Sequence, residues 1–582
     1  MSTADFSFPL NVYARMLELD EGRLDYLHYG LFERDDEPVW QAQERASRRL
    51  WGVLPPPCRV LEVGIGVGTT LRRLCDAGYR ATGITPDAAQ VAEVRARLGD
   101  EVDLRVTTLE ALPAQADPFD LMLLQESAQY IEPLALFEAA DRLLADDATL
   151  VVMDEFALAR RGPEDTGLHR FDAFVALAVR MGWTLDHDED VSAQAAGTAM
   201  AIGRLVERQR AALQRDLKLQ PEAIDALLQS TRHYQRQYAE GVFGYRVLRL
   251  RRRARPALRM AAVGAADADA VRALFERVFG HAMSAAEWHW KYGDGRGRCV
   301  GLWQGGTLVA HYGSASRAVR IDGAEARAVQ VGDVMVLPEA NAGLGRQGAL
   351  QQVSATLLEQ QIGWGAPHVV GYGFPNPRAM KVAERLGLYG AVDEVIQLEW
   401  TANATQRWRD AAWSVEEVDP ATFDLHGAQA RALESAWQAM AAGLPRALLP
   451  VRNPAWLRHR YGTRPGVRYR LHLVRSRLGA AVAGALVLRE HDTHMELVDL
   501  VGAPQRLRLL VRVARGLAAA AGRSGLHAWI TTSHADRLDD PADPALRRPM
   551  GVAVPTCVHT PGPAPDALRG RWFLMAGDTD FR

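Results

Sequence analysis

The chain has 582 residues, of which 48% are hydrophobic and 24% charged, and its formal net charge is −3. This length exceeds what one hydrophobic core supports and predicts roughly three or four domains. The balanced charge argues against a nucleic acid partner, and no apolar run approaches the roughly 18 residues of a membrane span. Four cysteines lack metal-ligand or disulfide-framework spacing. We therefore expect a soluble cytoplasmic protein that binds neither nucleic acid nor membrane.

Residues 1–50 are predicted to be mainly helical. Tyr13, Met16 and Leu17 are spaced to form an apolar stripe on one helix face. Aromatic residues interrupt this pattern between positions 26 and 32. This segment is either an aromatic cluster that packs an N-terminal cap or a segment that closes over a ligand, with His28 and Tyr29 as the candidate contacts.

Residues 58–70 predict a strand, a tight turn and a helix. The apolar run over residues 60–63 is typical of a buried parallel strand. Three glycines in the next five positions let the backbone turn sharply and approach a ligand without interference from Cβ atoms. A helix predicted over residues 69–77 directs its free N–H groups to the same place. Glu62 lies just before the glycines, where its carboxylate can accept from a ligand ammonium or hold the loop.

Strand and helix patterns alternate after this turn. The predicted strands span residues 80–84, 102–107, 119–125 and 149–156, and the helices residues 87–98 and 134–144. Such repeated units imply a doubly wound parallel sheet with a ligand beyond the carboxyl ends of its strands. A helix over 171–181, a strand over 183–191, a helical segment over 194–238 and a strand over 244–250 complete the region.

The first 250 residues resemble the class I S-adenosylmethionine-dependent methyltransferases. Glu62-Val-Gly-Ile-Gly-Val-Gly68 is similar to the family's first motif, and Phe119-Asp120-Leu-Met-Leu-Leu124 to its fourth-strand signature. A nicotinamide-binding Rossmann domain is the competing interpretation. It would carry G-x-G-x-x-G, whereas this chain has G-x-G-x-G.

The resemblance implies a set of cofactor contacts. Gly83-Ile-Thr-Pro-Asp-Ala-Ala-Gln90 is similar to the cyclopropane-synthase-like branch, in which the Thr and Gln bind the cofactor's sugar. Asp87 is an alternative ribose ligand, or only a helix cap. The S-adenosylmethionine contacts that the family implies are Tyr29, Glu62, Gly64, Gly66, Gly68, Thr85, Gln90, Thr108, Leu109 and Gln125.

Residues 125–130 end the fourth strand and are expected to face the transferred methyl group. Cyclopropane synthases carry a Glu here that holds a bicarbonate base, and Gln129 takes that position in this chain. This departure argues against cyclopropanation and for methyl transfer to a heteroatom or an acidic carbon. Glu126 and Tyr130 are the candidates that orient or deprotonate the acceptor, or they are strand-end residues bonded only to neighbours. Residues 194–238 are expected to cover the acceptor pocket.

A basic linker over residues 251–256 precedes a second pattern, and we interpret it as a solvated boundary. The predicted strands span residues 258–263, 299–303, 308–318 and 326–337, and the helices residues 267–279 and 350–361. Residues 257–400 resemble the GNAT-family acyltransferases. Gln330-Val-Gly-Asp-Val-Met-Val-Leu-Pro-Glu339 is similar to the family's fourth strand, which splays from its neighbour and leads into a glycine loop.

This second resemblance implies a coenzyme A site. Consecutive backbone N–H groups in a glycine loop before a helix suit the coenzyme A pyrophosphate. Ala340 replaces the usual Arg or Gln at the start of this loop. The contacts to acetyl-CoA or another acyl-CoA that the family implies are Val334, Val336, Gly343, Gly345 and Asn376.

The catalytic groups of this region are less complete. Asp333 is the candidate base, or a structural acid that bonds loop amides. Ala383 occupies the position at which the family often has a Tyr that protonates the leaving thiolate, so Tyr372 or Tyr389 is the candidate substitute.

Residues 401–582 are predicted to repeat this module in degenerate form. Arg460-Tyr461-Gly462 echoes Lys291-Tyr292-Gly293, and Asp499 matches Asp333. No glycine loop follows the corresponding strand, so a structural partner for the first copy is the expected role.

These patterns predict an α/β protein with three domains. A doubly wound Rossmann-like methyltransferase domain spans residues 1–252, a GNAT domain 257–400 and a second, degenerate GNAT-like domain 401–582. The expected function is bifunctional: methyl transfer from S-adenosylmethionine to a small-molecule acceptor, and acyl transfer from acyl-CoA to an amine. The alternative is a methyltransferase fused to a non-catalytic GNAT-like module that binds a ligand or partner. No metal site is expected.

Overall fold

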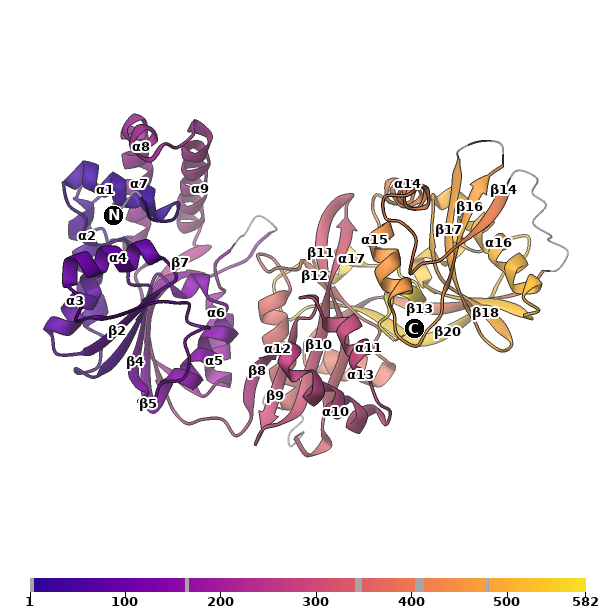
Figure 1. Ribbon diagram of the computed structural model, residues 1–582, viewed down its shortest axis with the longest axis horizontal. Helices are drawn as coiled ribbons and strands as arrows, with labels where there is room; N and C mark the ends of the chain where they lie inside the picture. The colour runs from indigo at the N-terminus through magenta and orange to yellow at the C-terminus, as the bar shows by residue number, and fades with distance from the viewer. Residues whose placement is uncertain are drawn as a thin grey trace. The chain divides into compact units, whose positions relative to one another are not determined.

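The computed structural model describes residues 5–162, 167–340, 348–403, 413–477, 479 and 481–581. Contacts divide the chain after Ala261 into two compact units, and each is described by itself. The first unit contains one sheet and the second contains two (Figure 1). No helix in the described part of the chain is long and apolar enough to cross a membrane.

The sheet of the first unit has the strand order β3-β2-β1-β4-β5-β7-β6. Its strands are β1 (Arg59–Val63), β2 (Arg80–Thr85), β3 (Asp103–Val106), β4 (Phe119–Gln125), β5 (Leu144–Ala157), β6 (Trp183–Asp190) and β7 (Phe243–Arg252). The strands from β3 to β5 are parallel, and β7 runs antiparallel to β5 and β6. The chain order reverses between β1 and β4, which creates a crevice beyond their carboxyl ends. The predicted doubly wound sheet is confirmed.

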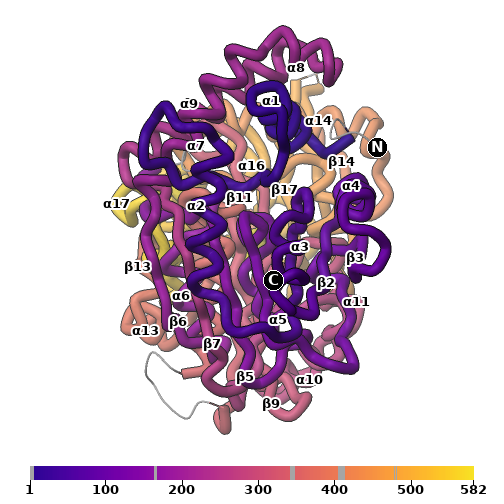
Figure 2. Tube along the Cα trace, turned by 90° about the vertical axis from the view of Figure 1, so that its left-hand side faces the viewer, coloured from indigo at the N-terminus to yellow at the C-terminus, as the bar shows by residue number. Residues whose placement is uncertain are grey.

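Nine helices are described in the first unit. They are α1 (Leu10–Glu21), α2 (Val39–Trp51), α3 (Thr69–Asp76), α4 (Ala88–Leu98), α5 (Pro133–Leu143), α6 (Phe171–Arg180), α7 (Ser192–Arg208), α8 (Arg210–Leu217) and α9 (Pro221–Ala239). Helices α1, α7, α8 and α9 pack together at one end of the unit (Figures 1 and 2). The helical pattern of residues 1–50 forms two helices on either side of the predicted aromatic interruption, and Gly22 ends α1 in a left-handed conformation (φ 66°).

The first sheet of the second unit has the order β12-β11-β10-β9-β8, with a short strand β15 on β10. Its strands are β8 (Arg259–Val263), β9 (Cys299–Gln304), β10 (Thr307–Ile321), β11 (Ala324–Val336), β12 (Val370–Tyr372) and β15 (Leu449–Pro450). β12 pairs in parallel with only residues 328–330 of β11. The remainder of β11 has no described strand on that side. This is the splay that the sequence predicts.

The third sheet repeats this arrangement. Its order is β14-β16-β17-β18-β19-β13-β20. Its strands are β13 (Tyr389–Thr401), β14 (Trp413–Val418), β16 (Arg470–Ser476), β17 (Val482–Glu490), β18 (His494–Val501), β19 (Gly525–Thr531) and β20 (Leu546–Cys557). The first five strands match β8 to β12 in order, and in both sheets the fourth and fifth strands are parallel.

β13 departs from a simple repeat. It lies between β19 and β20 in the third sheet and is antiparallel to both. Leu398 of this strand is fully buried in the core of that sheet. The predicted boundary at residue 400 therefore falls within hydrogen-bonded structure of the third sheet.

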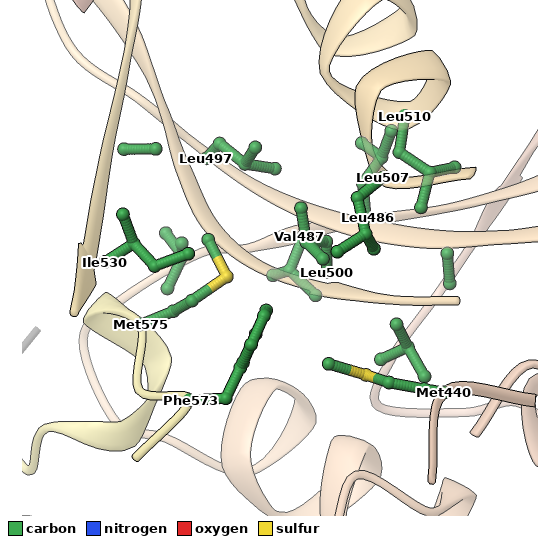
Figure 3. Packing of buried hydrophobic residues seen from close by; sticks show 14 of the residues in the cluster. Met440, Leu486, Val487, Leu497, Leu500, Leu507, Leu510, Ile530, Phe573 and Met575 are labelled. Carbon is green, nitrogen blue, oxygen red and sulfur yellow. The ribbon is translucent and has the colours of Figure 1, made fainter. Parts of the chain in front are cut away.

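The helices of the second unit cover both sheets. They are α10 (Ala268–Phe279), α11 (Ala285–Tyr292), α12 (Ala349–Gln361), α13 (Pro377–Arg385), α14 (Ala428–Gly443), α15 (Pro454–Leu457), α16 (Leu507–Ala520) and α17 (Pro565–Leu568). Figure 3 shows side chains of α14 and α16 packed on strands β17 to β19. Phe573 and Met575 close this core from the C-terminal segment, so that segment is part of the fold.

The position of β13 predicts which fragments fold. A fragment of residues 257–582 should unfold cooperatively, whereas a fragment of residues 257–400 should not, because its last strand has lost both partners. Circular dichroism during thermal unfolding of both fragments tests this. A cooperative transition in the shorter fragment would show that residues 257–400 are independent of the third sheet.

Candidate functional site

The glycine turn after β1 leaves open space at one position. Gly64, Gly66 and Gly68 all have positive φ, at 82°, 52° and 83°. A Cβ on Gly64 would lie 2.7 Å from Ser127, and one on Gly68 would lie 2.6 Å from Val94, so these two glycines are needed for packing. A Cβ on Gly66 would meet nothing nearer than 4.0 Å. Gly66 therefore faces a cavity.

This cavity has a volume of about 770 Å³ and lies at the carboxyl edge of the first sheet. The sequence-predicted residues that line it are Tyr29, Glu62, Gly64, Gly66, Thr85, Gln90, Thr108, Leu109, Gln125, Glu126 and Tyr130. Gly68 is not among the lining residues. Side chains from α1, α7 and α9 complete the wall, so the segment expected to cover a pocket lines this one.

Glu62 presents a buried acid to the cavity. Glu62 is 3% exposed, and its Oε2 atom has no hydrogen-bond partner among the described residues. Burial raises its pKa to about 8. A buried polar atom without a partner costs free energy, which a ligand donor would recover.

Thr85 and Gln90 form a pair at the end of β2. The Thr85 hydroxyl donates to Gln90 Oε1 at 3.0 Å, and both residues are buried against the cavity. Asp87 lies between them and caps α4, since its Oδ1 accepts from the backbone N–H groups of Ala89 (2.9 Å) and Gln90 (3.4 Å). Asp87 thus acts as a helix cap, and it also lines the cavity.

Two more acids lie at the ends of β4 and β5. Glu126 Oε1 accepts from the Tyr29 backbone N–H at 2.5 Å and from the Tyr245 hydroxyl at 2.6 Å. Glu155 accepts from the Tyr238 hydroxyl at 2.6 Å. Burial raises the pKa of Glu155 to about 8 and that of Glu126 well above its usual range. Glu155 can therefore hold a proton near neutral pH.

The two candidate acceptor-binding residues, Glu126 and Tyr130, differ in backbone conformation and in exposure. Glu126 has φ 56°, a left-handed conformation that is uncommon for a non-glycine residue and often marks a functional site. Tyr130 is 80% exposed and lies at the rim of the cavity.

The tyrosines of this site are largely missed by sequence reasoning. Tyr13 and Tyr234 line the cavity, and Tyr245 and Tyr238 hold its acids. They come from α1, α9 and β7, and the sequence pattern of each element indicates only that the tyrosine lies on the apolar face. A tyrosine at a core position of each element is the signal that was available, because a buried hydroxyl needs a partner.

In the second unit, Asp333 is held by two donors. Lys291 Nζ lies 3.0 Å from both carboxylate oxygens, and the Tyr292 hydroxyl donates to Oδ2 at 2.6 Å. The Asp333 side chain is 7% exposed. A one-residue bulge in β11 occurs here, and Asp333 has φ 46°. The carboxylate is thus fixed by two side chains, whereas the structural alternative from the sequence has it bonded to loop amides.

The third sheet carries a matching pair. The Tyr461 hydroxyl donates to Asp499 Oδ2 at 2.8 Å, and Arg452 Nε donates to Oδ1 at 2.9 Å. β18 also has a register shift beside Asp499. The same tyrosine–aspartate contact at the same bulge therefore occurs twice in the second unit.

The predicted coenzyme A contacts lie on β11, at the start of α13 and outside the described residues. Val334 is 37% exposed and Val336 half-buried, both on the part of β11 that has no described strand beyond it. Asn376 caps α13, since its Oδ1 accepts from the Ala379 backbone N–H at 2.9 Å. Gly343 and Gly345 lie outside the described residues.

The candidate proton donors can also be located. Ala383 is buried in a small cluster that contains Leu388. The Tyr372 hydroxyl donates to Gln330 Oε1 at 3.2 Å, and the buried Tyr389 hydroxyl has no partner among the described residues. These contacts do not identify either tyrosine as the acid that protonates the leaving thiolate.

Comparisons with known proteins agree with both motifs. A model of methyltransferase domains matches residues 61–152, and a model of acetyltransferase (GNAT) domains matches residues 259–391. A ubiquinone biosynthesis O-methyltransferase of Methylocella silvestris is 28% identical in an alignment 173 residues long that covers 23% of this chain and 68% of that protein.

Solved structures also resemble parts of the chain, with TM-scores of 0.36 and 0.40. The cyclase SpnF is 22% identical with a TM-score of 0.36, over 41% of this chain and 91% of its own. A conserved protein from Enterococcus faecalis V583, described as a probable N-acyltransferase, is 13% identical with a TM-score of 0.40, over 52% of this chain and 73% of its own.

The chain thus combines two transferase domains. It contains a methyltransferase domain followed by a GNAT acetyltransferase domain, as the motifs predict. The type of the third sheet is not identified by these matches and remains a prediction.

The paired aspartates predict a stability effect. Asp333→Asn and Asp499→Asn should each destabilise the second unit by about 3 kcal/mol, because each leaves a buried cation with one charged partner fewer. Differential scanning calorimetry measures the shift. Asp492→Asn, at an exposed position, is the control and should change stability by less than about 0.5 kcal/mol.

The opposite outcome is equally informative. If Asp333→Asn removes acyl-CoA turnover while melting temperature and coenzyme A affinity stay unchanged, Asp333 is a catalytic base rather than a structural acid.

Proposed function

We propose that residues 1–252 transfer a methyl group from S-adenosylmethionine to a small-molecule acceptor. The observation that carries this proposal is that Gly66 and Glu62 meet at one cavity. The glycine leaves open space, and the acid presents a buried oxygen without a described partner. An ammonium group is a donor that satisfies such an oxygen, and S-adenosylmethionine carries one. The match of residues 61–152 to methyltransferase domains supports the same cofactor.

The lining residues fit the other parts of this cofactor. We assign the Thr85–Gln90 pair to the ribose hydroxyls, Thr108 and Leu109 to the adenine, and Tyr29 and Gln125 to the methionine end. When bound, the cofactor supplies an electrophilic methyl group on a sulfonium.

In this reaction the protein positions the cofactor and the acceptor and excludes water from them. Methyl transfer needs aligned reactants more than a strong base. Helices α1, α7 and α9 line the cavity with apolar side chains such as Met16, Ile202 and Leu227. In this proposal Glu126 orients the acceptor at the methyl end, and Tyr130 contacts it from the rim.

A second activity is proposed for residues 257–400, namely transfer of an acyl group from acyl-CoA to an amine. It is supported by the open edge of β11, whose backbone at Val334 and Val336 is available to a thioester arm. Asn376 also belongs to this proposed site, and the roles of Gly343 and Gly345 stay predictions from the sequence. Residues 401–582 are proposed to be a degenerate GNAT-like repeat, supported by the repeated strand order and the Tyr461–Asp499 contact.

The alternative is a GNAT-like half that binds a ligand or partner without catalysis. It is supported by Ala383 at the usual tyrosine position and by the fixed contacts of Asp333. Release of thiol from acetyl-CoA by the full chain, measured with and without a panel of amines, separates the two. Amine-dependent release supports the transferase, whereas tight acetyl-CoA binding with no release in any condition supports the binding module.

The open space at Gly66 predicts a specific binding defect. Gly66→Arg should lower S-adenosylmethionine affinity at least about 100-fold, because the side chain would occupy the cavity. Gly99→Arg is the matched control, since Gly99 also has positive φ (82°) but nothing within 4 Å of its Cβ position and no place in the cavity wall. Calorimetry measures both. Unchanged affinity in folded Gly66→Arg would remove this site.

Glu62 predicts a proton-linked cofactor affinity. Its pKa of about 8 keeps it protonated at pH 7, and binding an ammonium requires the carboxylate, so binding releases a proton. Affinity should therefore rise by close to tenfold between pH 6 and 7, rise less as the pH approaches 8, and fall once the ligand's ammonium loses its proton.

The test is calorimetry in buffers of different ionisation enthalpy. Glu62→Gln should abolish the proton release and the pH dependence, while the exposed control Glu101→Gln retains both. A pH dependence that survives in Glu62→Gln would assign the released proton to another group.

A further inference from the structure

The ionisable side chains that line the cavity of the first unit are carboxyl groups, tyrosines and one histidine among the described residues. None of its lining residues in the described part of the chain is a lysine or an arginine. The lining carboxyl groups are those of Asp25, Glu62, Asp87, Glu110, Glu126 and Glu155. An anionic ligand would thus enter a low-dielectric space without any counter-charge, at a high cost in free energy.

A histidine adds an unused acceptor to this cavity. His28 is 9% exposed, and its Nδ1 lies 2.8 Å from the Tyr29 carbonyl oxygen. A carbonyl only accepts, so Nδ1 carries the proton and Nε2 is left with a lone pair. Nε2 is buried and has no partner among the described residues. Burial lowers the pKa of His28 to about 4, so the ring is neutral and supplies no positive charge.

Tyrosine rings surround the acids at the acceptor end. Tyr13, Tyr29, Tyr130 and Tyr234 all line the cavity. Burial raises the pKa of Tyr13 and Tyr234, and the nearby Glu155 adds to both shifts. These phenols therefore stay neutral, and their ring faces are available to a cation.

We propose that the methyl acceptor is a primary or secondary amine with an apolar or aryl body, bound as a cation between the tyrosine rings and the carboxyl groups of Glu126 and Glu155. This inference rests on the proposed methyl transfer and names its substrate class. The unpaired Nε2 of His28 and the absence of basic lining residues from the described cavity wall both favour a ligand rich in donors. The apolar side chains of α1, α7 and α9 suit a hydrocarbon body.

The chemistry balances with the groups at hand. Binding of the ammonium displaces the proton that Glu155 holds at neutral pH into solvent, and the resulting carboxylate then takes a proton from the ammonium, which frees the nitrogen lone pair. That lone pair forms the new N–C bond as the C–S bond of the sulfonium breaks, and the bonding electrons return to sulfur. Burial keeps the pKa of Glu155 at about 8, so it is suited to hold this proton at neutral pH.

The test compares three probes of similar size and different charge. They are 2-phenylethylamine, 4-ethylphenol and 3-phenylpropanoate, which are a cation, a neutral phenol and an anion at pH 7. Calorimetry with the full-length protein, saturated with S-adenosylhomocysteine, gives the affinity of each without turnover. We expect the amine to bind at least about tenfold more tightly than the phenol, and the carboxylate more weakly than both.

Variants locate the preference. Glu155→Gln should remove the advantage of the amine over the phenol, and Glu101→Gln should leave it intact. Tyr234→Leu should weaken amine binding about tenfold, and Tyr234→Phe should restore it, because only the ring is needed. This second pair of variants keeps the test decisive if Glu155→Gln does not fold.

Several results would overturn the inference. The inference is wrong if the phenol or the carboxylate binds as tightly as the amine. It is also wrong if Glu155→Gln has the same probe affinities as Glu101→Gln, or if Tyr234→Leu binds the amine as tightly as Tyr234→Phe does. Binding of S-adenosylhomocysteine with none of the three probes would also refute it. Failure of S-adenosylhomocysteine itself to bind is a separate result, which refutes the proposed function instead.

Discussion

Burial of carboxyl groups without a cationic partner is the constraint around which the first unit is built. Glu62, Asp154 and Glu155 are at most 4% exposed, and no lysine or arginine of the described residues is hydrogen-bonded to them. Burial raises the pKa of each, to about 8, about 7 and about 8. Keeping such groups inside costs free energy, so the rest of the sheet and its helices must stabilise them.

Tyrosine hydroxyls and backbone N–H groups offset part of that cost. Tyr238 of α9 donates to Glu155 on β5, and Tyr245 of β7 donates to Glu126 at the end of β4. Tyr29 stacks on Tyr245 with ring centroids 5.7 Å apart. These contacts join the helices that cover the cavity to the strands beneath it. The same acids therefore serve the fold and give the cavity its chemical character.

In the second unit, by contrast, the buried carboxylates of Asp333 and Asp499 are paired with cationic side chains. Asp333 pairs with Lys291, and Asp499 with Arg452, which also reaches Asp578 in the C-terminal segment. Asp580 approaches Lys291 at 3.2 Å. The two sheets of this unit are thus joined by ion pairs as well as by β13, which follows the first set of strands but pairs within the third sheet. Contacts of both kinds therefore hold the two sheets of this unit together.

Local patterns determined most elements of this protein. The apolar run before the glycines marks β1, and the residues from Phe119 to Gln125 form β4 as the sequence predicts. Glu62, Thr85 and Gln90 are identified because motif residues lie next to their strands in the chain. Such signals are local, since a strand or a turn is encoded by residues that are neighbours in sequence.

Tertiary structure alone decided which distant residues share a site. Tyr13, Tyr234 and Tyr245 come from three elements far apart in the chain and meet only when α1, α9 and β7 pack on the sheet edge. The contacts of Asp333 with Lys291 and Tyr292, and the pairing of β13, likewise depend on packing. Periodicity shows which face of an element is buried, but the partner of that face is chosen by the fold as a whole.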